Sequence, residues 1–259
     1  MNIIVCVKRV PLTQEVDLEI DPKKNEVRKE MLAYAINEWD NYAVEEAVRL
    51  KEKFQGDVTA ITIGDEDDEE VLRRCLAMGA DRALRIDPGA LDLDAFVISK
   101  ILAEVIGNLK YDLILTGVQT DDMNNGAVGI MLAEHLGVAH AAVVIGIEPE
   151  ANGVKLRLEL EGGTDEVSTI KLPALLSIQT GINEPRYVSI MGIRKAAKKE
   201  LRVTPADALH LSPDDLSPRT RIEAVFFPPE TAGAEIIDGD PATIAGRILR
   251  IIKEKGGRV

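Results

Sequence analysis

Apolar runs and amphipathic stretches alternate along the first half of the chain. Residues 2–7 (NIIVCV) form an apolar run rich in β-branched side chains, which is typical of a strand buried on both faces of a parallel sheet. Residues 37–54 instead place apolar side chains at helical spacing, with Asn37 as a candidate N-cap. Further strands are expected at residues 58–64, 82–86 and 112–117, and further helices at residues 69–80, 95–109 and 127–137. This alternation predicts an α/β fold, a doubly wound, mostly parallel, Rossmann-like sheet with crossover helices.

The pattern changes after about residue 146. Residues 154–172 alternate apolar and polar side chains around Gly162 and Gly163, which predicts an antiparallel β-hairpin, and the run LPALLSI predicts one more strand. From Val203 onward the chain is typical of an extended arm that ends in a short helix at residues 242–255. We therefore expect two parts, an α/β domain at residues 1–202 and a C-terminal arm at residues 203–259.

Composition narrows the possible partners and the compartment. The 259 residues include 31 Lys plus Arg against 44 Asp plus Glu, a net charge of −13, which counts against nucleic acid as a partner. No apolar stretch is long enough to predict a membrane span or a signal peptide. Cys6 and Cys75 lie far apart in the sequence and suggest neither a redox pair nor a disulfide, so a cytoplasmic location is expected.

One loop has the composition of a ligand site. The segment GVQTDDMNNGAVG, residues 117–129, connects the carboxyl end of a predicted strand to the start of a predicted helix. Ligands bind at this edge of doubly wound sheets, and backbone N–H groups at a helix N-terminus favour phosphate. The segment matches neither a Walker A loop nor GxGxxG, so an ordinary surface loop rich in turn-forming residues is the competing interpretation.

A second candidate is the tetrapeptide NEWD, residues 37–40, at the start of the first long helix. Its side chains could contact an adenosine that lies across the strand ends. The competing interpretation is an ordinary N-cap followed by first-turn acids that complement the helix dipole. The three histidines form no metal-ligand set, and no nucleophile with an adjacent base is evident, so we assign neither a metal nor a catalytic residue.

Several segments together resemble the β subunit of electron transfer flavoprotein. They are VKRVP near the start, AVEEAVRLKE, LAMGADRA, GVQTDD, LPALLSI, and NEPRY followed by a Lys-rich stretch. The resemblance implies a doubly wound α/β fold and a heterodimer with an α subunit that holds most of one FAD. It implies an electron carrier, not an enzyme, that accepts electrons from flavin dehydrogenases such as acyl-CoA dehydrogenases. A quinone-reducing membrane oxidoreductase is a further candidate partner, and the C-terminal arm is expected to pack on the α subunit.

The resemblance also implies an adenine nucleotide in this subunit, either AMP or, in members that bifurcate electrons, a second FAD. By position the pocket maps onto Cys6, Asn37, Glu38, Trp39, Asp40, Ile63, Gly117, Gln119, Thr120, Asp121, Asp122, Met123, Asn124, Asn125, Gly126, Ala127 and Val128. Gly126 and Val128 stand where AMP-binding members tend to carry Asn and Thr. Asp40 and the Val128–Gly129 pair resemble the bifurcating members, so both nucleotides remain open.

The segment after NEPRY resembles the family's recognition loop for the partner dehydrogenase. By position Ile190 is the protruding aliphatic residue, and Arg194 belongs to a local basic group that would attract an acidic partner. The residues alone, without the resemblance, favour a connecting helix with a solvated basic face. Two other functions stay open at this point, an ATP-using enzyme of the related adenine-nucleotide hydrolase type and a stress-type ligand sensor of the same fold.

Overall fold

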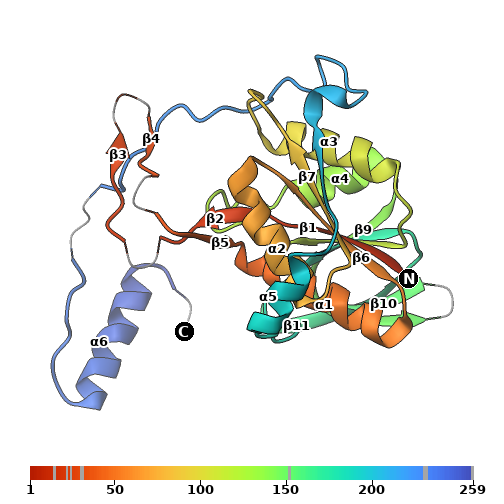
Figure 1. The fold of residues 1–259 in the computed structure, drawn as a ribbon. Helices are drawn as coiled ribbons and strands as arrows, with labels where there is room; N and C mark the ends of the chain where they lie inside the picture. Colours follow the sequence, from red (N-terminus) through yellow and green to blue (C-terminus); the bar gives the residue numbers. More distant parts are fainter. Residues whose placement is uncertain are drawn as a thin grey trace. The chain divides into compact units, whose positions relative to one another are not determined.

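The computed structural model describes residues 1–13, 16–21, 23, 25–29, 32–150, 153–229 and 233–257 (Figure 1). The chain divides into two compact units, Met1–Glu223 and Ala224–Val259. The expected boundary between residues 202 and 203 falls inside a strand of the first unit, Leu201–Pro205. Residues 203–223 therefore belong to the first unit, because this strand pairs with the sheet and Ala206, Leu209 and Leu216 pack on the core.

A nine-stranded sheet forms the centre of the first unit, in the order β11-β10-β9-β12-β8-β1-β6-β7-β13. The strands from β9 to β13 in this order are parallel, and β10 and β11 add an antiparallel hairpin at one edge. Their bounds are β1 Asn2–Cys6, β6 Asp57–Ile63, β7 Arg82–Asp87, β8 Leu113–Gly117, β9 Ala139–Glu150, β10 Gly153–Leu160, β11 Thr164–Ile170, β12 Ala174–Ile178 and β13 Leu201–Pro205. The predicted parallel sheet and hairpin are confirmed.

Helices cover both faces of the sheet, so the fold is doubly wound as predicted (Figure 1). One face carries α1 (Glu38–Phe54), α2 (Glu69–Met78) and α5 (Ile190–Ala196). The other face carries α3 (Ala95–Gly107) and α4 (Val128–Leu136). The five helices lie where the amphipathic patterns and the basic segment indicated.

Strand β1 shows why the central strands are apolar on both faces. Ile3 and Val5 pack in the core under α1 and α2, whereas Ile4 and Cys6 pack in the core under α3 and α4. Successive side chains of a strand point to opposite faces, so a strand covered on both sides must be apolar throughout. This double burial fixes the position of the loops that leave the sheet.

The structure also contains elements that the sequence pattern did not predict. Strand β9 joins the hairpin to the parallel strands, and β13 forms the opposite edge by pairing with β7. Two small antiparallel ladders lie in the polar stretch before α1, β2 (Arg9–Pro11) with β5 (Tyr34–Ile36) and β3 (Ile20–Asp21) with β4 (Glu26–Val27). Single 3-10 turns occur at η1 (Glu66–Asp68) and η2 (Ala206–Ala208).

The second unit consists of extended chain and helix α6 (Pro241–Glu254), which confirms the predicted terminal helix. The Asp240 side chain caps α6 by accepting hydrogen bonds from Ala242 N and Thr243 N at 3.0 and 3.2 Å. No residue of α6 is buried, and Phe226, Phe227 and Ile236 in the preceding segment are also exposed. Across the described residues, no helix has both the length and the apolar character needed to cross a bilayer.

Candidate functional site

The carboxyl ends of β1 and β8 lie next to each other in the middle of the sheet. The chain continues from β1 to α1 on one face and from β8 to α4 on the other face. This arrangement is the topological switch point at which doubly wound proteins bind ligands. The residues that border it are the loop at 118–127 and the first turn of α1.

Two side chains at the start of α1 tie the loops together. Asn37 donates from Nδ2 to the carbonyl of Gln119 at 2.8 Å and accepts the N–H of Asp121 at 3.1 Å. Asp40 accepts the N–H of Gly117 at 3.0 Å and the N–H of Lys8 at 2.8 Å. Asn37 occupies the N-cap position, but its side chain caps no N–H of α1, so the capping part of the competing interpretation is wrong, whereas the expected first-turn acids, Glu38 and Asp40, are present. These residues hold the edges of the switch point.

Asp40 is a buried carboxylate, with 5% of its surface exposed. Burial raises its pKa to about 7, although the hydrogen bonds from the backbone N–H groups of Lys8 and Gly117 act in the opposite direction. The adjacent Cys6 is also buried, and burial followed by the charge of Asp40 raises its pKa to about 12. Cys6 is therefore a neutral thiol at physiological pH, as expected of a small core residue.

The loop after β8 is exposed from Asp121 to Gly126, and Gln119 and Thr120 are half-buried. Asn124 and Gly126 adopt left-handed backbone conformations, with φ of 55° and 60°. The Lys8 Nζ lies 2.5 Å from a carboxylate oxygen of Asp122 and neutralises part of the loop's negative charge. Helix α4 begins at Val128, directly after the loop, and no side chain among the described residues caps it. Its first N–H groups are therefore free to bind an anion.

Gly129 allows α4 to start close to the sheet. A Cβ at this position would lie 2.7 Å from Thr116 Oγ1 and 2.8 Å from Ser177 Oγ, two hydroxyls at the ends of β8 and β12. Packing alone thus requires glycine here, whatever ligand the loop binds. Gly129 and Asp40 were two of the residues that pointed to a bifurcating member, and both have a structural explanation.

The remaining predicted residues occupy separate places. Cys6 and Ile63 end β1 and β6, and both pack into the core under α3 and α4. Trp39 donates from Nε1 to Gln179 Oε1 at 2.8 Å, and Glu38 is exposed. Met123, Asn125, Ala127 and Val128 complete the loop and the start of α4.

Ile190 and Arg194 lie outside this group, on helix α5, which packs on α2. Ile190 is 71% exposed, and Met191 and Ile193 next to it are exposed as well. The segment is thus a helix with an apolar and basic outer face.

Sequence reasoning missed Lys8 and Gln179. Lys8 pairs with the loop, and Gln179 links Trp39 to Glu159, whose carboxylate accepts from Gln179 Nε2 at 2.9 Å. Both residues follow the carboxyl end of a parallel strand, and that position is a usable signal. Among the described residues, no three His, Cys, Asp or Glu side chains are grouped to hold a metal ion.

Fold and site together define a doubly wound α/β protein with a candidate anion-binding loop at its switch point. A sequence profile described as the electron transfer flavoprotein domain matches residues 27–209, which is more than half of the chain.

Full-length relatives agree with this match. The chain is 38% identical to the electron transfer flavoprotein subunit beta of Methylophilus methylotrophus over 264 residues, 99% of this chain and 100% of the relative. It is 34% identical to the subunit of the same name from Bacillus subtilis strain 168, over 98% of each chain. It is also 34% identical to the caffeyl-CoA reductase-Etf complex subunit CarD of Acetobacterium woodii, over 98% of this chain and 99% of the relative. The chain belongs to the β-subunit family of the electron transfer flavoproteins.

Asp40 should make stability depend on pH in a predictable direction. An unfolded aspartate has a pKa near 4, whereas Asp40 in the folded protein has a pKa of about 7. Between these values the folded state binds more protons than the unfolded state, so the free energy of unfolding falls as the pH rises from about 4 to about 7. At about 1.4 kcal/mol per pKa unit, the total fall is of the order of 4 kcal/mol. We expect Asp40→Asn to remove this fall while losing one backbone hydrogen bond.

Urea unfolding at a series of pH values, followed by the emission of the single tryptophan, Trp39, measures the effect. Asp112→Asn is the matched control, because that carboxylate also accepts a backbone N–H, from Asn2 at 2.6 Å, but is less buried. Parallel curves for the wild type and Asp40→Asn across this pH range would contradict the assignment.

Proposed function

We propose that this chain pairs with an α subunit and that the heterodimer, with FAD held mainly by the α subunit, carries electrons from flavin dehydrogenases such as acyl-CoA dehydrogenases to an acceptor. The observation that carries the proposal is the likeness to β subunits over nearly the whole chain, at 38% identity for one of them. A quinone-reducing membrane oxidoreductase is the proposed acceptor. The flavin, when bound, supplies the reversible uptake and release of electrons, and the protein supplies binding and docking.

The second unit supports the pairing. Phe226 and Phe227 are 73% and 57% exposed, and α6 leaves Ile248, Leu249 and Ile252 exposed too. Apolar side chains exposed in this number are typical of a surface that another subunit covers. We propose that this unit packs on the α subunit.

The switch point supports an adenine nucleotide in this chain. The backbone N–H groups of Ala127 and Val128 would hold a phosphate. Cys6 and Ile63 end β1 and β6, and Trp39 lies in the first turn of α1, where the adenosine is proposed. The loop fits a phosphate at Gly126, because a Cβ there would meet only the Val118 carbonyl, at 3.5 Å. Asp40 supports the pocket indirectly, through the backbone of Lys8 and Gly117. AMP and FAD share this adenosine and phosphate chemistry.

Helix α5 supports docking to a dehydrogenase. Ile190 is exposed, and Arg194, Lys195 and Lys198, which follow it in α5 and in the turn after α5, are exposed as well. One aliphatic anchor with a charged rim is typical of a small transient interface, and the basic rim favours an acidic partner surface.

Replacing both phenylalanines of the second unit should weaken the heterodimer. We expect Phe226→Ser with Phe227→Ser to lower the affinity for the α subunit by about 2 kcal/mol or more, roughly thirtyfold, because interface aromatics dominate binding energy. Sedimentation of the co-expressed subunits measures the association. Val167→Ser, at a 61% exposed apolar residue of β11, is the control. Equal effects of the two changes would reject the second unit as the main contact.

A bulky residue at Gly126 should empty the nucleotide pocket. We expect Gly126→Leu to reduce the nucleotide that copurifies with the heterodimer, because the side chain would fill the space where backbone meets phosphate. Gly89→Leu is the control: Gly89 has φ of 58°, close to the 60° of Gly126, and open space around it. Both variants then carry the same cost of a left-handed residue, about 1–2 kcal/mol.

Acid extraction followed by chromatography counts the nucleotides. Two FAD per heterodimer would favour a bifurcating complex, and one FAD with one AMP would favour an ordinary carrier. A single FAD with no second adenine nucleotide in the wild type would remove the proposed pocket and leave the electron carrier in place.

Ile190→Ala should impair docking. We expect the dehydrogenase concentration for half-maximal electron exchange to rise by roughly thirtyfold, which corresponds to about 2 kcal/mol for a truncated anchor, while the flavin content stays constant. A medium-chain acyl-CoA dehydrogenase reduced by its acyl-CoA is the probe. Ile222→Ala, at a 61% exposed isoleucine outside α5, is the control. Identical kinetics for wild type and Ile190→Ala would show that α5 is not the docking element.

A further inference from the structure

Helix α5 has only seven residues, which is too short for a stable helix in isolation. We propose that Arg186 and Lys199 are positioning residues that hold α5, one on each side of it, in the orientation that docking requires. This inference rests on the proposed docking function of α5. Neither residue needs to touch the partner.

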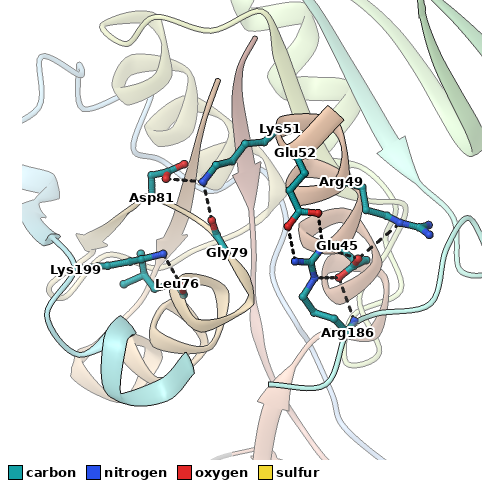
Figure 2. A network of polar contacts seen from close by, with 9 residues as sticks. All are labelled: Glu45, Arg49, Lys51, Glu52, Leu76, Gly79, Asp81, Arg186 and Lys199. Carbon is teal, nitrogen blue, oxygen red and sulfur yellow. Dashed lines mark hydrogen bonds and ion pairs between the residues drawn. The ribbon is translucent and has the colours of Figure 1, made fainter. Parts of the chain in front are cut away.

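Arg186, in the segment before α5, forms hydrogen bonds and ion pairs with two glutamates of α1. Its backbone N–H and Nε donate to one carboxylate oxygen of Glu45 at 3.1 and 2.8 Å, and a terminal guanidinium nitrogen donates to the other at 3.1 Å (Figure 2). The two terminal nitrogens also donate to the carboxylate oxygens of Glu52 at 2.8 and 3.2 Å. Glu45 and Glu52 are seven residues apart on α1, so both face the same side of the helix. A planar guanidinium can serve two carboxylates at once, and an ammonium group cannot do so with the same geometry.

Burial strengthens this contact. The side chain of Glu45 is 4% exposed, so its partner cannot be replaced easily by water. Asn183 adds a second contact with α1, because its Nδ2 donates to a carboxylate oxygen of Glu46 at 3.0 Å and to the carbonyl of Tyr42 at 3.1 Å. The segment from Asn183 to Arg186 is therefore bound to α1 just before α5 begins.

The C-terminal end of α5 and the residues after it are joined to α2 by hydrogen bonds in both directions. Arg73 of α2 donates to the carbonyls of Ala196 and Lys199 at 3.2 and 3.1 Å. In return the Lys199 Nζ donates to the carbonyl of Leu76, in the last turn of α2, at 3.0 Å (Figure 2). It also donates to the carbonyl of Ala80, just after α2, at 2.5 Å. Basic side chains at helix C-termini satisfy carbonyls that the helix leaves unpaired. Each of the two helices is thus capped by a residue of the other segment.

The middle of α5 lies directly on α2. A Cβ at Gly192 would be 3.3 Å from the carbonyl of Ala77, and Ala196, one turn later, is buried. The opposite side of α5 presents Ile190, Met191 and Ile193. Because both ends and the inner side are fixed, the apolar face is ordered before a partner arrives. A preformed face avoids part of the ordering cost of binding.

The test uses the heterodimer with Arg186→Lys, which keeps the positive charge but lacks the planar set of donors that lets a guanidinium bind two carboxylates. We expect the amide hydrogens of Ile193 and Ala197, which donate to Ser189 O and Ile193 O, to exchange with deuterium about tenfold faster. We expect the dehydrogenase concentration for half-maximal electron exchange to rise by about tenfold as well. Flavin content and the rate at saturating dehydrogenase should not change. Arg28→Lys, which alters an exposed pair with Glu19 at 2.9 Å, should leave both readouts unchanged.

Unchanged deuterium exchange in α5 would overturn the proposal. Faster exchange with unchanged half-saturation would also overturn it, provided that Ile190→Ala still weakens docking. If Ile190→Ala has no effect either, the docking function itself is rejected, and the two failures are thereby distinguished. If Arg186→Lys lowers the flavin content, two other variants test the contacts separately by the same readouts. Glu52→Gln, at the more exposed of the two carboxylates, weakens the contact of Arg186 with α1. Lys199→Met removes the contact of Lys199 with α2.

Discussion

Three carboxylates of α1 are buried, and each requires hydrogen-bond donors from inside the protein. A buried charge without a partner is unfavourable by several kcal/mol, so the segments that provide donors are held in place. The partners are the N–H groups of Lys8 and Gly117 for Asp40, Arg186 for Glu45, and Asn183 for Glu46. These donors come from the loop after β1, from the last residue of β8 and from the segment before α5. One helix therefore fixes the edges of the switch point and the base of α5 together.

The length of α1 separates these two places. Asp40 lies in the first turn and Glu52 in the last turn of a 17-residue helix, which is about 25 Å long. A helix packed along one face of the sheet is rigid, so contacts at one end need not disturb the other. On the proposed docking function of α5, this separation lets a partner bind and leave at α5 without loosening the loop at the switch point.

Much of the fold could be predicted from the sequence, because double burial leaves a clear pattern. Strands β1, β8 and β12 are mostly apolar and buried on both faces, and the helices between them have one apolar face. Strand β9 escaped prediction because most of its residues are half-buried or exposed and the run includes Gly146 and Pro149. Strand β13 escaped because only its pairing with β7 makes it a strand, and pairing partners 118 residues apart leave no local signal.

The candidate site, like the fold, could be predicted from the sequence only in part. The loop at 117–128 could be located, because it follows a strand and precedes a helix. The contacts that shape it could not be predicted, since Asn37 and Asp40 reach residues 77 to 84 positions further along the chain. The family resemblance implied that Asp40 borders a nucleotide, whereas its carboxylate accepts the backbone N–H groups of Lys8 and Gly117. A side chain's partner is decided by tertiary packing, and sequence spacing carries little information about it.

The basic side chains at α5 belong to a chain that is acidic as a whole, so their position affects how a partner is attracted. The net charge of −13 would repel an acidic partner at long range, yet α5 and the turn after it carry Arg194, Lys195 and Lys198, all of them exposed. At physiological ionic strength charges are screened beyond about 8 Å, so an approaching surface responds mainly to the groups nearest to it. A loose α5 would spread its positive charge over many positions and weaken the local attraction. Holding the helix by Arg186 and Lys199 therefore orders the basic rim together with the apolar anchor, and the local field can act against the sign of the whole chain.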